Sequence, residues 1–235
     1  MNMERIAIIP ARGGSKRIPR KNIKDFLGKP IISYTIEAAL QSKMFSEIMV
    51  STDDESIADI ARTFGASVPF LRSSNNANDH ATTFEVIEEV LLRYKSKGMV
   101  FGEACCIYPT APFTTPQRLK QFHEFLDTSN FDCVFPVLKY GYPIQRGLQL
   151  SDHNQMRMIS PEHLVTRSQD LTPSYHDAGQ FYWFRVDRLL QFGQLWTDNT
   201  GALEINEMEA HDIDNLDDWE IAEFKYQLFQ KKKVR

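Results

Sequence analysis

The stretch RIAIIPARGGSKRIPRKN, residues 5–22, joins a short apolar run to a loop that carries a Gly-Gly pair and five cations. The apolar run ends at Pro10 and has the length and composition of a buried β-strand. Gly13 and Gly14 allow the backbone to approach a ligand closely, and successive N–H groups in such a turn bind anions. Lys and Arg side chains beside that turn add charge-assisted hydrogen bonds to phosphate oxygens. The loop therefore has the chemistry of a triphosphate site.

Two common phosphate-binding motifs are absent from this loop. It lacks the spacing G-x-x-x-x-G-K-[ST] of a P-loop and the spacing G-x-G-x-x-G of a dinucleotide site. The interpretation that the loop binds a triphosphate in another way stays open. So does a basic loop that is merely solvated, because short motifs also match by chance.

Beyond the loop, short apolar runs alternate with segments of helical periodicity. This alternation predicts an α/β fold in which helices flank both faces of a mostly parallel sheet. Such sheets bind ligands at the carboxyl ends of their strands, where the basic loop is expected to lie. Strands are predicted at residues 5–10, 47–52, 66–72, 103–109, 132–138 and 179–186, and helices at 30–43, 54–65, 82–98, 115–128 and 215–230.

Polar residues at the predicted helix starts support these assignments. Asp53 is predicted to cap the helix that stops at Gly65, and Asn215 to cap the last helix. Thr82 and Glu85 have the spacing of a capping box. The helical segments are therefore expected to begin close to these residues.

The alternation breaks between residues 140 and 175, a polar segment without a long periodic run. A long irregular excursion in a compact domain is usually functional or disordered. The length of 235 residues suits one well-packed core. We therefore expect a single domain over residues 1–235, with residues 140–175 as an appendage.

Composition narrows the class of protein. The net charge of −4 argues against general nucleic-acid binding, which requires a broad basic face. Three cysteines make no disulfide framework, and Cys105 and Cys106 lie in an apolar run where burial is expected. The sequence shows no signal-peptide h-region and no run near the ~20 apolar residues of a membrane span. We expect a cytoplasmic protein that does not bind membranes.

Five segments occur in order along most of the chain: IPARGGSKRIPRKNI (9–23), VSTDDESIADIA (50–61), YPTAPF (108–113), TRSQDLTPSYHDAGQFYWF (166–184) and HDIDNLDDW (211–219). Together they resemble the motifs of the CMP-sialic acid synthetases, cytidylyltransferases that activate sugar acids with CTP. The resemblance implies a Rossmann-like nucleotidyltransferase fold. It also implies that the anomeric 2-hydroxyl of a nine-carbon sugar acid attacks the α-phosphorus of CTP and displaces pyrophosphate.

Two departures from the family pattern bear on the substrate. Tyr108 stands where the family usually has Gln, and Ala178-Gly179 follows Asp177 where it usually has Asn-Gly. These features resemble the pseudaminic acid cytidylyltransferase branch, which implies pseudaminate as the sugar acid. Synthetases for CMP-N-acetylneuraminate, CMP-legionaminate or the activated eight-carbon acid of lipopolysaccharide are the alternatives within enzymes. A non-catalytic nucleotide-binding regulator is the alternative from another class.

The resemblance assigns roles to individual residues. The cations of the first loop neutralise the phosphates of CTP, and Asn22 contacts the nucleotide. Arg17 and Arg20 are expected to be solvated or paired with surface acids. The nucleotide-binding residues are expected to be Ala11, Arg12, Gly13, Lys16, Lys21, Asn22, Arg72, Asp79 and Thr82, with Arg12, Lys16, Lys21 and Asp214 acting in catalysis.

Asp212 and Asp214 lie two apart in a segment that reads as extended, so both carboxylates share one face. Two hard oxygen ligands suit Mg²⁺, which keeps several waters and bridges substrate phosphates. The alternative is a pair of exposed acids near a helix start. In the family this acidic segment is the metal site, so Mg²⁺ is the expected cofactor.

The family motif places Tyr108, Arg167, Gln169 and Gln180 on the sugar side. Residues 140–175 resemble the family's dimerisation arm, which reaches across a two-fold axis to the partner's sugar site. A homodimer is therefore expected, and two-fold dimers are the commonest symmetric oligomers.

Overall fold

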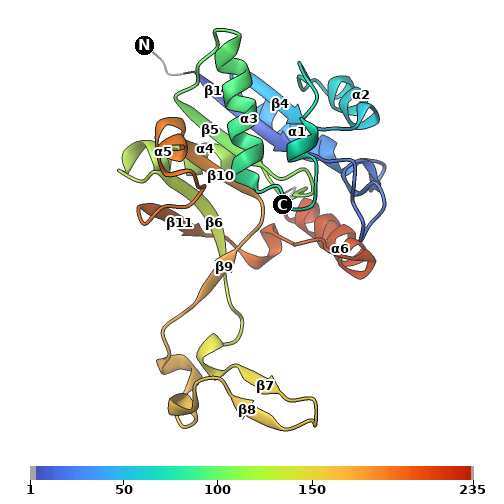
Figure 1. Cartoon of the computed structure of the whole chain (residues 1–235). Coiled ribbons are helices and arrows are strands. Elements are labelled where there is room, and N and C mark those ends of the chain that lie inside the picture. The colour runs from blue at the N-terminus through green and yellow to red at the C-terminus, as the bar shows by residue number, and fades with distance from the viewer. Residues whose placement is uncertain (1–3, 234–235) are drawn as a thin grey trace.

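The structure, a computed structural model, describes residues 4–233 (Figure 1). Its central sheet has the strand order β11-β6-β10-β5-β1-β4, with β9 paired to β6. β1 runs parallel to β4 and β5, and β11 runs parallel to β6, whereas β10 is antiparallel to both of its neighbours. The strands are β1 (Arg5–Pro10), β4 (Glu47–Ser51), β5 (Glu103–Ile107), β6 (Cys133–Lys139), β9 (Tyr175–Asp177), β10 (Phe181–Arg185) and β11 (Thr200–Glu204).

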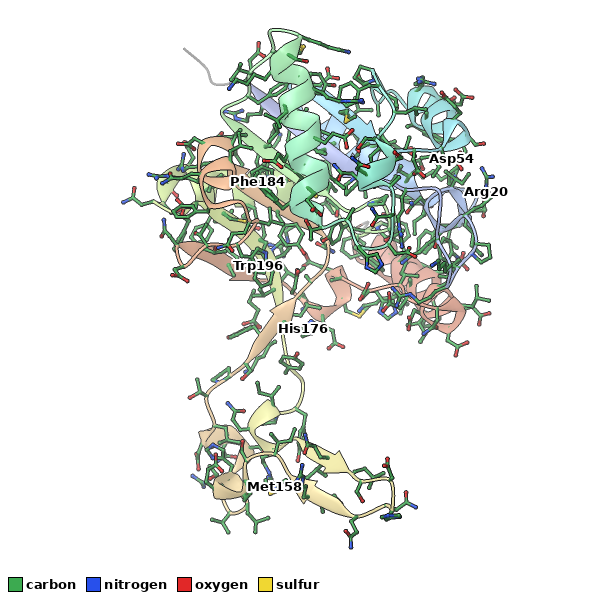
Figure 2. The ribbon with its side chains drawn as sticks, in the orientation of Figure 1. Arg20, Asp54, Met158, His176, Phe184 and Trp196 are labelled. Atoms are coloured by element: carbon green, nitrogen blue, oxygen red, sulfur yellow. The ribbon has the colours of Figure 1, made fainter. Side chains whose placement is uncertain are left out.

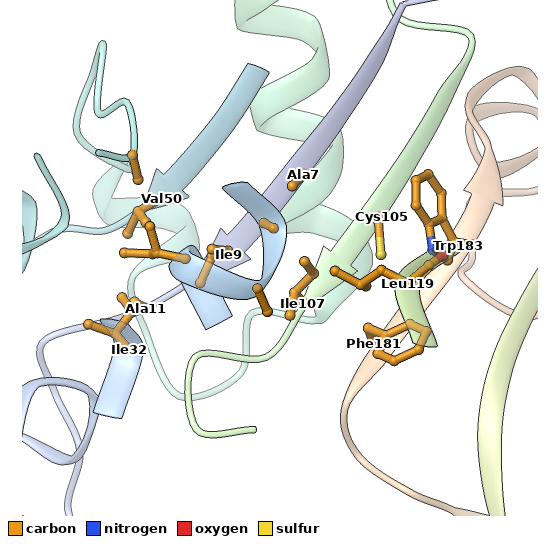
Figure 3. Close-up of a cluster of buried hydrophobic side chains, with 14 of the residues drawn as sticks. Ala7, Ile9, Ala11, Ile32, Val50, Cys105, Ile107, Leu119, Phe181 and Trp183 are labelled. Atoms are coloured by element: carbon orange, nitrogen blue, oxygen red, sulfur yellow. Dashed lines mark hydrogen bonds between the residues drawn. The ribbon is translucent and has the colours of Figure 1, made fainter. Parts of the chain in front are cut away.

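Helices cover both faces of this sheet. α1 (Ile31–Ser42), α2 (Glu55–Thr63) and α4 (Pro116–Thr128) pack on one face, and α3 (Thr83–Ser96) and α5 (Val186–Phe192) pack on the other. Figure 3 shows the first of these layers, with Ile32 and Leu119 of the helices over Ile9, Ile107 and Trp183 of the strands. The predicted α/β fold is confirmed.

Burial on both faces explains why the first strand is a continuous apolar run. Ile6 and Ile8 point into the cluster under α3, while Ala7 and Ile9 point into the cluster under α1 and α4. All four side chains are 0% exposed. A strand with one solvated face would alternate apolar and polar residues instead.

The last helix, α6 (Leu216–Lys233), closes the carboxyl edge of the sheet beside the loop that follows β1 (Figure 1). Trp219 and Ile213 join Ile18 and Phe26 in a separate buried cluster. The segment after the first strand and the last helix therefore meet at one place. The short elements are the hairpin β2 (Asp25–Phe26) with β3 (Lys29–Pro30) and the 3₁₀ turns η1 (Lys21–Ile23), η2 (Ser74–Asn76), η3 (Ile144–Arg146), η4 (Pro161–His163), η5 (Ser168–Asp170) and η6 (Glu207–Glu209).

The segment between β6 and β9 leaves the body as a protruding arm (Figure 1). The arm carries the hairpin β7 (Leu148–Leu150) with β8 (Met156–Met158). Figure 2 shows Met158 far out on the arm and His176 on its stalk, away from Arg20 and Asp54 in the body. Several large apolar side chains of the arm are exposed, among them Leu150 at 68% and Val165 at 89%.

Two sequence predictions at this level are wrong. The cap of α2 is Asp54, whose carboxylate accepts hydrogen bonds from the N–H groups of Ser56 and Ile57, and not Asp53. Residues 66–72 form no strand, because only Ser67 makes a bridge to β4. Pro69 lies in the middle of this segment and has no N–H to donate to a ladder.

Other local predictions are confirmed. Thr82 and Glu85 form a reciprocal capping box at the start of α3. The Asn215 side chain accepts a hydrogen bond from the Asp218 N–H at the start of α6. Cys105 and Cys106 are free and buried. Across residues 4–233, no helix combines the length and the apolar character that a bilayer crossing requires.

Candidate active site

A cavity of about 430 Å³ opens at the carboxyl ends of the parallel strands. It lies between the loop that follows β1, the loop that precedes α3, the turn after β5 and the start of α6. Most of the predicted phosphate-side residues meet here although they come from four regions of the chain. The lining residues are Pro10, Arg12, Ser15, Lys16, Arg17, Lys21, Asn22, Asp79, Thr110 and Asp214.

The backbone of the basic loop is held by its neighbours. The N–H of Ala11 donates to Ser51 O at 2.8 Å, which continues the pairing of β1 with β4. The N–H of Gly13 donates to the carboxylate of Asp53 at 2.9 Å. A Cβ at Gly13 would lie 2.9 Å from Cβ of Asp54, so the loop needs glycine at its contact with the start of α2. Ala11 and Gly13 thus shape the loop through their backbone.

Asn22 supports the loop from within the cavity. Its side chain is 8% exposed, and its amide donates to Arg12 O at 2.9 Å. Asn22 is itself one of the residues that line the cavity. Asn22 therefore links the loop backbone to the cavity.

Arg12 and Lys16 both bind the carboxylate of Asp79, which comes from the loop before α3. Hydrogen bonds from Lys16 and then Arg12 lower the pKa of Asp79 to about 2. Asp79 therefore stays ionised and balances the charge of two of the loop cations. The pairs are partly exposed and are open to exchange with other anions.

Lys21 joins the basic loop to the acidic segment before α6. Its ammonium donates to Ile213 O, and burial lowers its pKa while Asp212 and Asp214 oppose that shift. Arg17 makes an exposed ion pair of 2.8 Å with Asp214. Arg17 is thus paired with an acid as expected, although that acid belongs to the cavity.

The acidic segment has the alternation expected of an extended chain. Ile213 is 1% exposed and points into the cluster under α6, while Asp212 is exposed and Asp214 is half-buried toward the cavity. Across residues 4–233, no three side chains of the types His, Cys, Asp and Glu are grouped so as to enclose a metal by themselves. The Asp214 carboxylate at the cavity, with the exposed Asp212 carboxylate two residues before it, nevertheless fits Mg²⁺, which usually takes one or two carboxylates and keeps waters.

Two predicted nucleotide residues make contacts outside the cavity lining. Arg72 is 8% exposed, and its guanidinium binds the side chain and carbonyl of Ser51 at the end of β4. Burial lowers the pKa of Arg72. Thr82 uses its hydroxyl in the capping box of α3. Both residues hold the elements around the cavity.

The predicted sugar-side residues fall into two groups. Tyr108 and Gln180 lie in the body, where the N–H of Tyr108 donates to Gln180 O at 2.8 Å. The Gln180 amide donates to Glu209 O. Arg167 and Gln169 lie on the exposed arm, where Arg167 pairs with Asp170 at 2.7 Å. One chain therefore does not bring these two groups together.

A hydroxyl cluster surrounds Tyr108. Its hydroxyl lies 3.3 Å from the hydroxyl of Thr83, and its ring packs edge to face against Tyr182. The Tyr182 hydroxyl donates to Asp177, whose other oxygen accepts from the Gly179 N–H at 2.9 Å. Burial raises the pKa of both Tyr108 and Tyr182.

Trp196 borders this cluster and was missed by the sequence analysis. Its ring stacks on Phe135 at 4.6 Å and lies 6.5 Å from the ring of Tyr182. At 47% exposed it offers an aromatic surface to solvent beside buried hydroxyls. The cavity residues Ser15 and Thr110 were also missed. Thr110 lies in the segment 108–113 that resembles a family motif, and its position just after β5 also pointed to it.

Comparison with known proteins agrees with this geometry. A model of the cytidylyltransferase family matches residues 6–195. This chain belongs to the cytidylyltransferase family. It is 40% identical over 226 residues to the pseudaminic acid cytidylyltransferase of Campylobacter jejuni serotype O:2, with 96% of this chain and 97% of that protein covered.

One further relative agrees with this family, and one solved structure agrees with the fold. The CMP-N,N'-diacetyllegionaminic acid synthase of Legionella pneumophila is 33% identical, with 99% of this chain and 100% of that protein covered. The solved structure of a CMP:2-keto-3-deoxy-manno-octonic acid synthetase complexed with CTP has a TM-score of 0.70 at 19% identity, with 97% of this chain and 99% of that chain covered. The structural likeness confirms the nucleotidyltransferase fold.

Proposed function

We propose that this cytidylyltransferase converts CTP and pseudaminate to CMP-pseudaminate and pyrophosphate. The observation that carries the proposal is the 40% identity to a pseudaminic acid cytidylyltransferase across nearly the whole of both chains. The cation-lined cavity at the carboxyl edge of the sheet independently supports a triphosphate substrate. Three free, buried cysteines support a reducing compartment, and we place the reaction in the cytoplasm.

The basic loop would hold the triphosphate. Arg12 and Lys16 are already drawn into the cavity by Asp79, and phosphate oxygens would replace that carboxylate. Lys21 lies deeper and is fixed by Ile213 O, so it would contact the phosphates from one set position. The N–H groups of Ala11 and Gly13 are engaged with the protein, whereas Gly14 has open space around it.

Asp212 and Asp214 would hold Mg²⁺ at the cavity. Mg²⁺ bound there would neutralise charge that develops on the phosphates as pyrophosphate departs. Asp214 faces the same cavity as the loop cations, so its ion pair with Arg17 would open when a metal binds. The ion pair is exposed and therefore weak, so the free-energy cost of that exchange is small.

The protein's part in the reaction is then positioning and charge stabilisation. The oxygen of the anomeric 2-hydroxyl of the sugar acid would form a bond to the α-phosphorus while the bond to pyrophosphate breaks, and the hydroxyl proton would pass to solvent. Arg12, Lys16 and Lys21 supply fixed positive charge beside the departing group. Arg72 and Thr82 keep the neighbouring strand end and helix start in place.

The sugar site is proposed around Tyr108, Tyr182 and Trp196. Buried hydroxyls would pair with polar substituents, and the exposed indole ring would cover an apolar one. Arg167 and Gln169 would complete the site from the arm of a second copy, because in one chain they lie apart from Tyr108. Gln180 would act indirectly, because its amide donates a hydrogen bond to Glu209 O. We therefore propose a homodimer.

The test uses the purified full chain with CTP and Mg²⁺. Pyrophosphate and CMP-sugar are measured with pseudaminate, N,N'-diacetyllegionaminate, N-acetylneuraminate and the eight-carbon acid as separate substrates. We expect kcat/KM for pseudaminate to exceed that for N-acetylneuraminate by at least ~10²-fold, because a site with unmatched buried polar groups rejects a near-isostere strongly.

Other outcomes of this panel discriminate among the remaining readings. Preference for the legionaminate would favour the second candidate, which the 33% identity to the Legionella enzyme supports. Equal turnover of pseudaminate and N-acetylneuraminate would contradict the branch assignment and leave the cytidylyltransferase activity intact. CTP binding without turnover of any acid would contradict the enzyme assignment.

A further inference from the structure

Asp212, a proposed metal ligand, has a side chain whose charge acts on Lys21 and His211. Among residues 4–233 its carboxylate makes no hydrogen bond or ion pair, and it is exposed. Its position therefore depends on how the backbone of the acidic segment 209–214 is held. That backbone is held by side chains that bind its carbonyl and N–H groups and by the side chain that binds Glu209.

Arg118 makes a contact with Glu209 through two hydrogen bonds. Its guanidinium binds the carboxylate of Glu209 through two parallel hydrogen bonds, from Nε at 2.7 Å and from Nη2 at 2.9 Å. Both side chains are about three-quarters buried, with 27% and 23% exposed. A bidentate pair of this kind fixes orientation as well as distance.

Arg118 is itself held at a defined place. It lies in the first turn of α4, where its N–H donates to the capping hydroxyl of Thr115 at 3.2 Å. The turn that leads from β5 into this helix contains Thr110, which lines the cavity. The contact therefore ties the acidic segment to the same edge of the sheet that presents the cavity.

Two further contacts act on the backbone next to Glu209. The Gln180 amide donates to Glu209 O, and the Lys225 ammonium donates to Ala210 O at 2.6 Å. On the other side of Asp212, Lys21 holds Ile213 O and Asp218 accepts from the Asp214 N–H at 2.9 Å. Among these contacts, that of Arg118 joins two side chains through two hydrogen bonds.

We propose that Arg118 and Glu209 act as a clamp that positions the carboxylates of Asp212 and Asp214 for a divalent cation. The metal role of these aspartates belongs to the proposed function, on which this inference rests. Arg118 is thus a positioning residue that touches neither nucleotide nor metal. The same contacts give Gln180 a positioning role for the acidic segment.

The first measurement is hydrogen exchange of the peptide that spans residues 207–215 in the full chain. Arg118→Met and Glu209→Gln should each reduce protection of the Asp214 and Asn215 amides by about tenfold. Arg118→Lys keeps the charge but loses the fork and should fall in between. The matched control is Arg62→Met, which removes an exposed pair with Asp59 on α2. It should leave this peptide unchanged.

The second measurement is the affinity of the same variants for Mn²⁺. The electron spin resonance signal of the free ion reports how much Mn²⁺ stays unbound. Loss of a group that orients metal ligands typically weakens metal affinity by about tenfold or more, and we expect that change in Arg118→Met. The double variant Arg118→Met/Glu209→Gln should lose no more affinity than either single variant. Arg62→Met should bind Mn²⁺ as the wild type does.

The outcomes separate the clamp from the metal site. Unchanged exchange of residues 207–215 in both Arg118→Met and Glu209→Gln would overturn the clamp. Faster exchange with unchanged Mn²⁺ affinity would reduce the pair to a structural contact and overturn its positioning role. Absence of Mn²⁺ binding to the wild type and to Asp214→Ala alike would overturn the metal site itself, together with any positioning toward it.

Discussion

The carboxyl edge of the sheet and the arm differ in how completely one chain builds them. At the sheet edge, Arg12, Lys21 and Asn22 each have a defined partner within the chain. On the arm, Val165 is 89% exposed, and Arg167 pairs with an exposed acid three residues away. One chain therefore brings the residues of the proposed nucleotide half together, whereas the proposed sugar half would draw on the arm of a second copy.

This difference explains how the proposed activity divides between folding and assembly. The cations of the cavity come from the loop after β1, and their partners Asp79 and Ile213 lie in the segments before α3 and α6. Exposed apolar side chains on a protruding segment are unfavourable unless another surface covers them. CTP binding should therefore survive disruption of the arm, and use of the sugar should not.

The largest expected effect is at the acidic segment. Asp214→Ala should lower the rate of pyrophosphate release by about 10³-fold, because a charge-stabilising group beside the phosphates is lost. Asp212→Ala should act in the same direction. Pyrophosphate release across a range of Mg²⁺ concentrations measures the effect, with circular dichroism to check the fold. Asp217→Ala, an exposed acid in the first turn of α6, is the matched control. Near-wild-type activity at limiting Mg²⁺ would remove that aspartate from the metal site.

The basic loop should show the next largest effect. Arg12→Ala and Lys16→Ala should each cost about 1.5–3 kcal/mol in kcat/KM for CTP, the range for a hydrogen bond to a charged group. Arg17→Ala should cost less, because its pair with Asp214 is exposed. Steady-state kinetics with CTP varied at saturating sugar acid gives the comparison. Equal, small effects from all three substitutions would mean that the loop is a diffuse basic surface.

Disrupting the arm tests the other half of the comparison. Leu150→Asp with Val165→Asp should shift the protein to monomer, because burying two charges in an apolar interface is unfavourable. Sedimentation velocity measures the oligomeric state, and calorimetry measures CTP binding. We expect turnover of the sugar acid to fall about tenfold or more while the Kd for CTP stays within about twofold. A monomeric variant with full turnover would contradict the shared sugar site.

Tyr108→Gln should have a smaller effect and sharpens the substrate assignment. The substitution replaces one hydroxyl beside Thr83 and Tyr182 with an amide that both donates and accepts. We expect the preference for pseudaminate over N-acetylneuraminate to narrow by about tenfold. Competition between the two acids in one reaction, read by mass spectrometry, measures the ratio. An unchanged ratio would remove Tyr108 from the discrimination.

Local signals in the sequence predicted the parts of the site, but not their contacts across the chain. The basic loop and the acidic segment each carry a readable motif, so Lys21 and Asp214 were named although 193 positions separate them. The pairing of Arg118 with Glu209 has no such motif, because an arginine on a helix and a glutamate in a turn are common anywhere. Trp196 was missed for the same reason.

The errors in the predicted fold have equally local causes. Asp53 and Asp54 are adjacent acids, and only the backbone conformation decides which one caps α2 and which one binds the Gly13 N–H. The strand β11 was missed because TGALE lacks a clear period. Its Gly201 packs so tightly against Phe131 that a Cβ would lie 2.4 Å from the ring. That contact depends on the tertiary fold.

The smallest expected effect concerns Asp79, which balances Arg12 and Lys16 at the mouth of the cavity. If phosphate oxygens take the place of this carboxylate, Asp79→Asn removes a competitor for the same two cations. We expect the KM for CTP to fall about two- to fivefold, the range for exposed ion pairs. Inhibition by inorganic tripolyphosphate should strengthen to the same extent. Asp59→Asn on α2, which breaks a pair with Arg62, is the matched control.

The pH dependence of this variant gives a second check. The pKa of Asp79 is lowered to about 2 by Lys16 and Arg12, so the carboxylate is charged throughout the neutral range. A lowered pKa means that the ion pairs form fully above the ordinary carboxyl pKa and are lost only as the pH falls through about 2. The ratio of wild-type to variant KM should therefore be constant from about pH 6 to 9. A higher KM in Asp79→Asn would show that the carboxylate helps to hold Arg12 and Lys16 for the nucleotide. The proposal that phosphate oxygens replace this carboxylate would then be wrong.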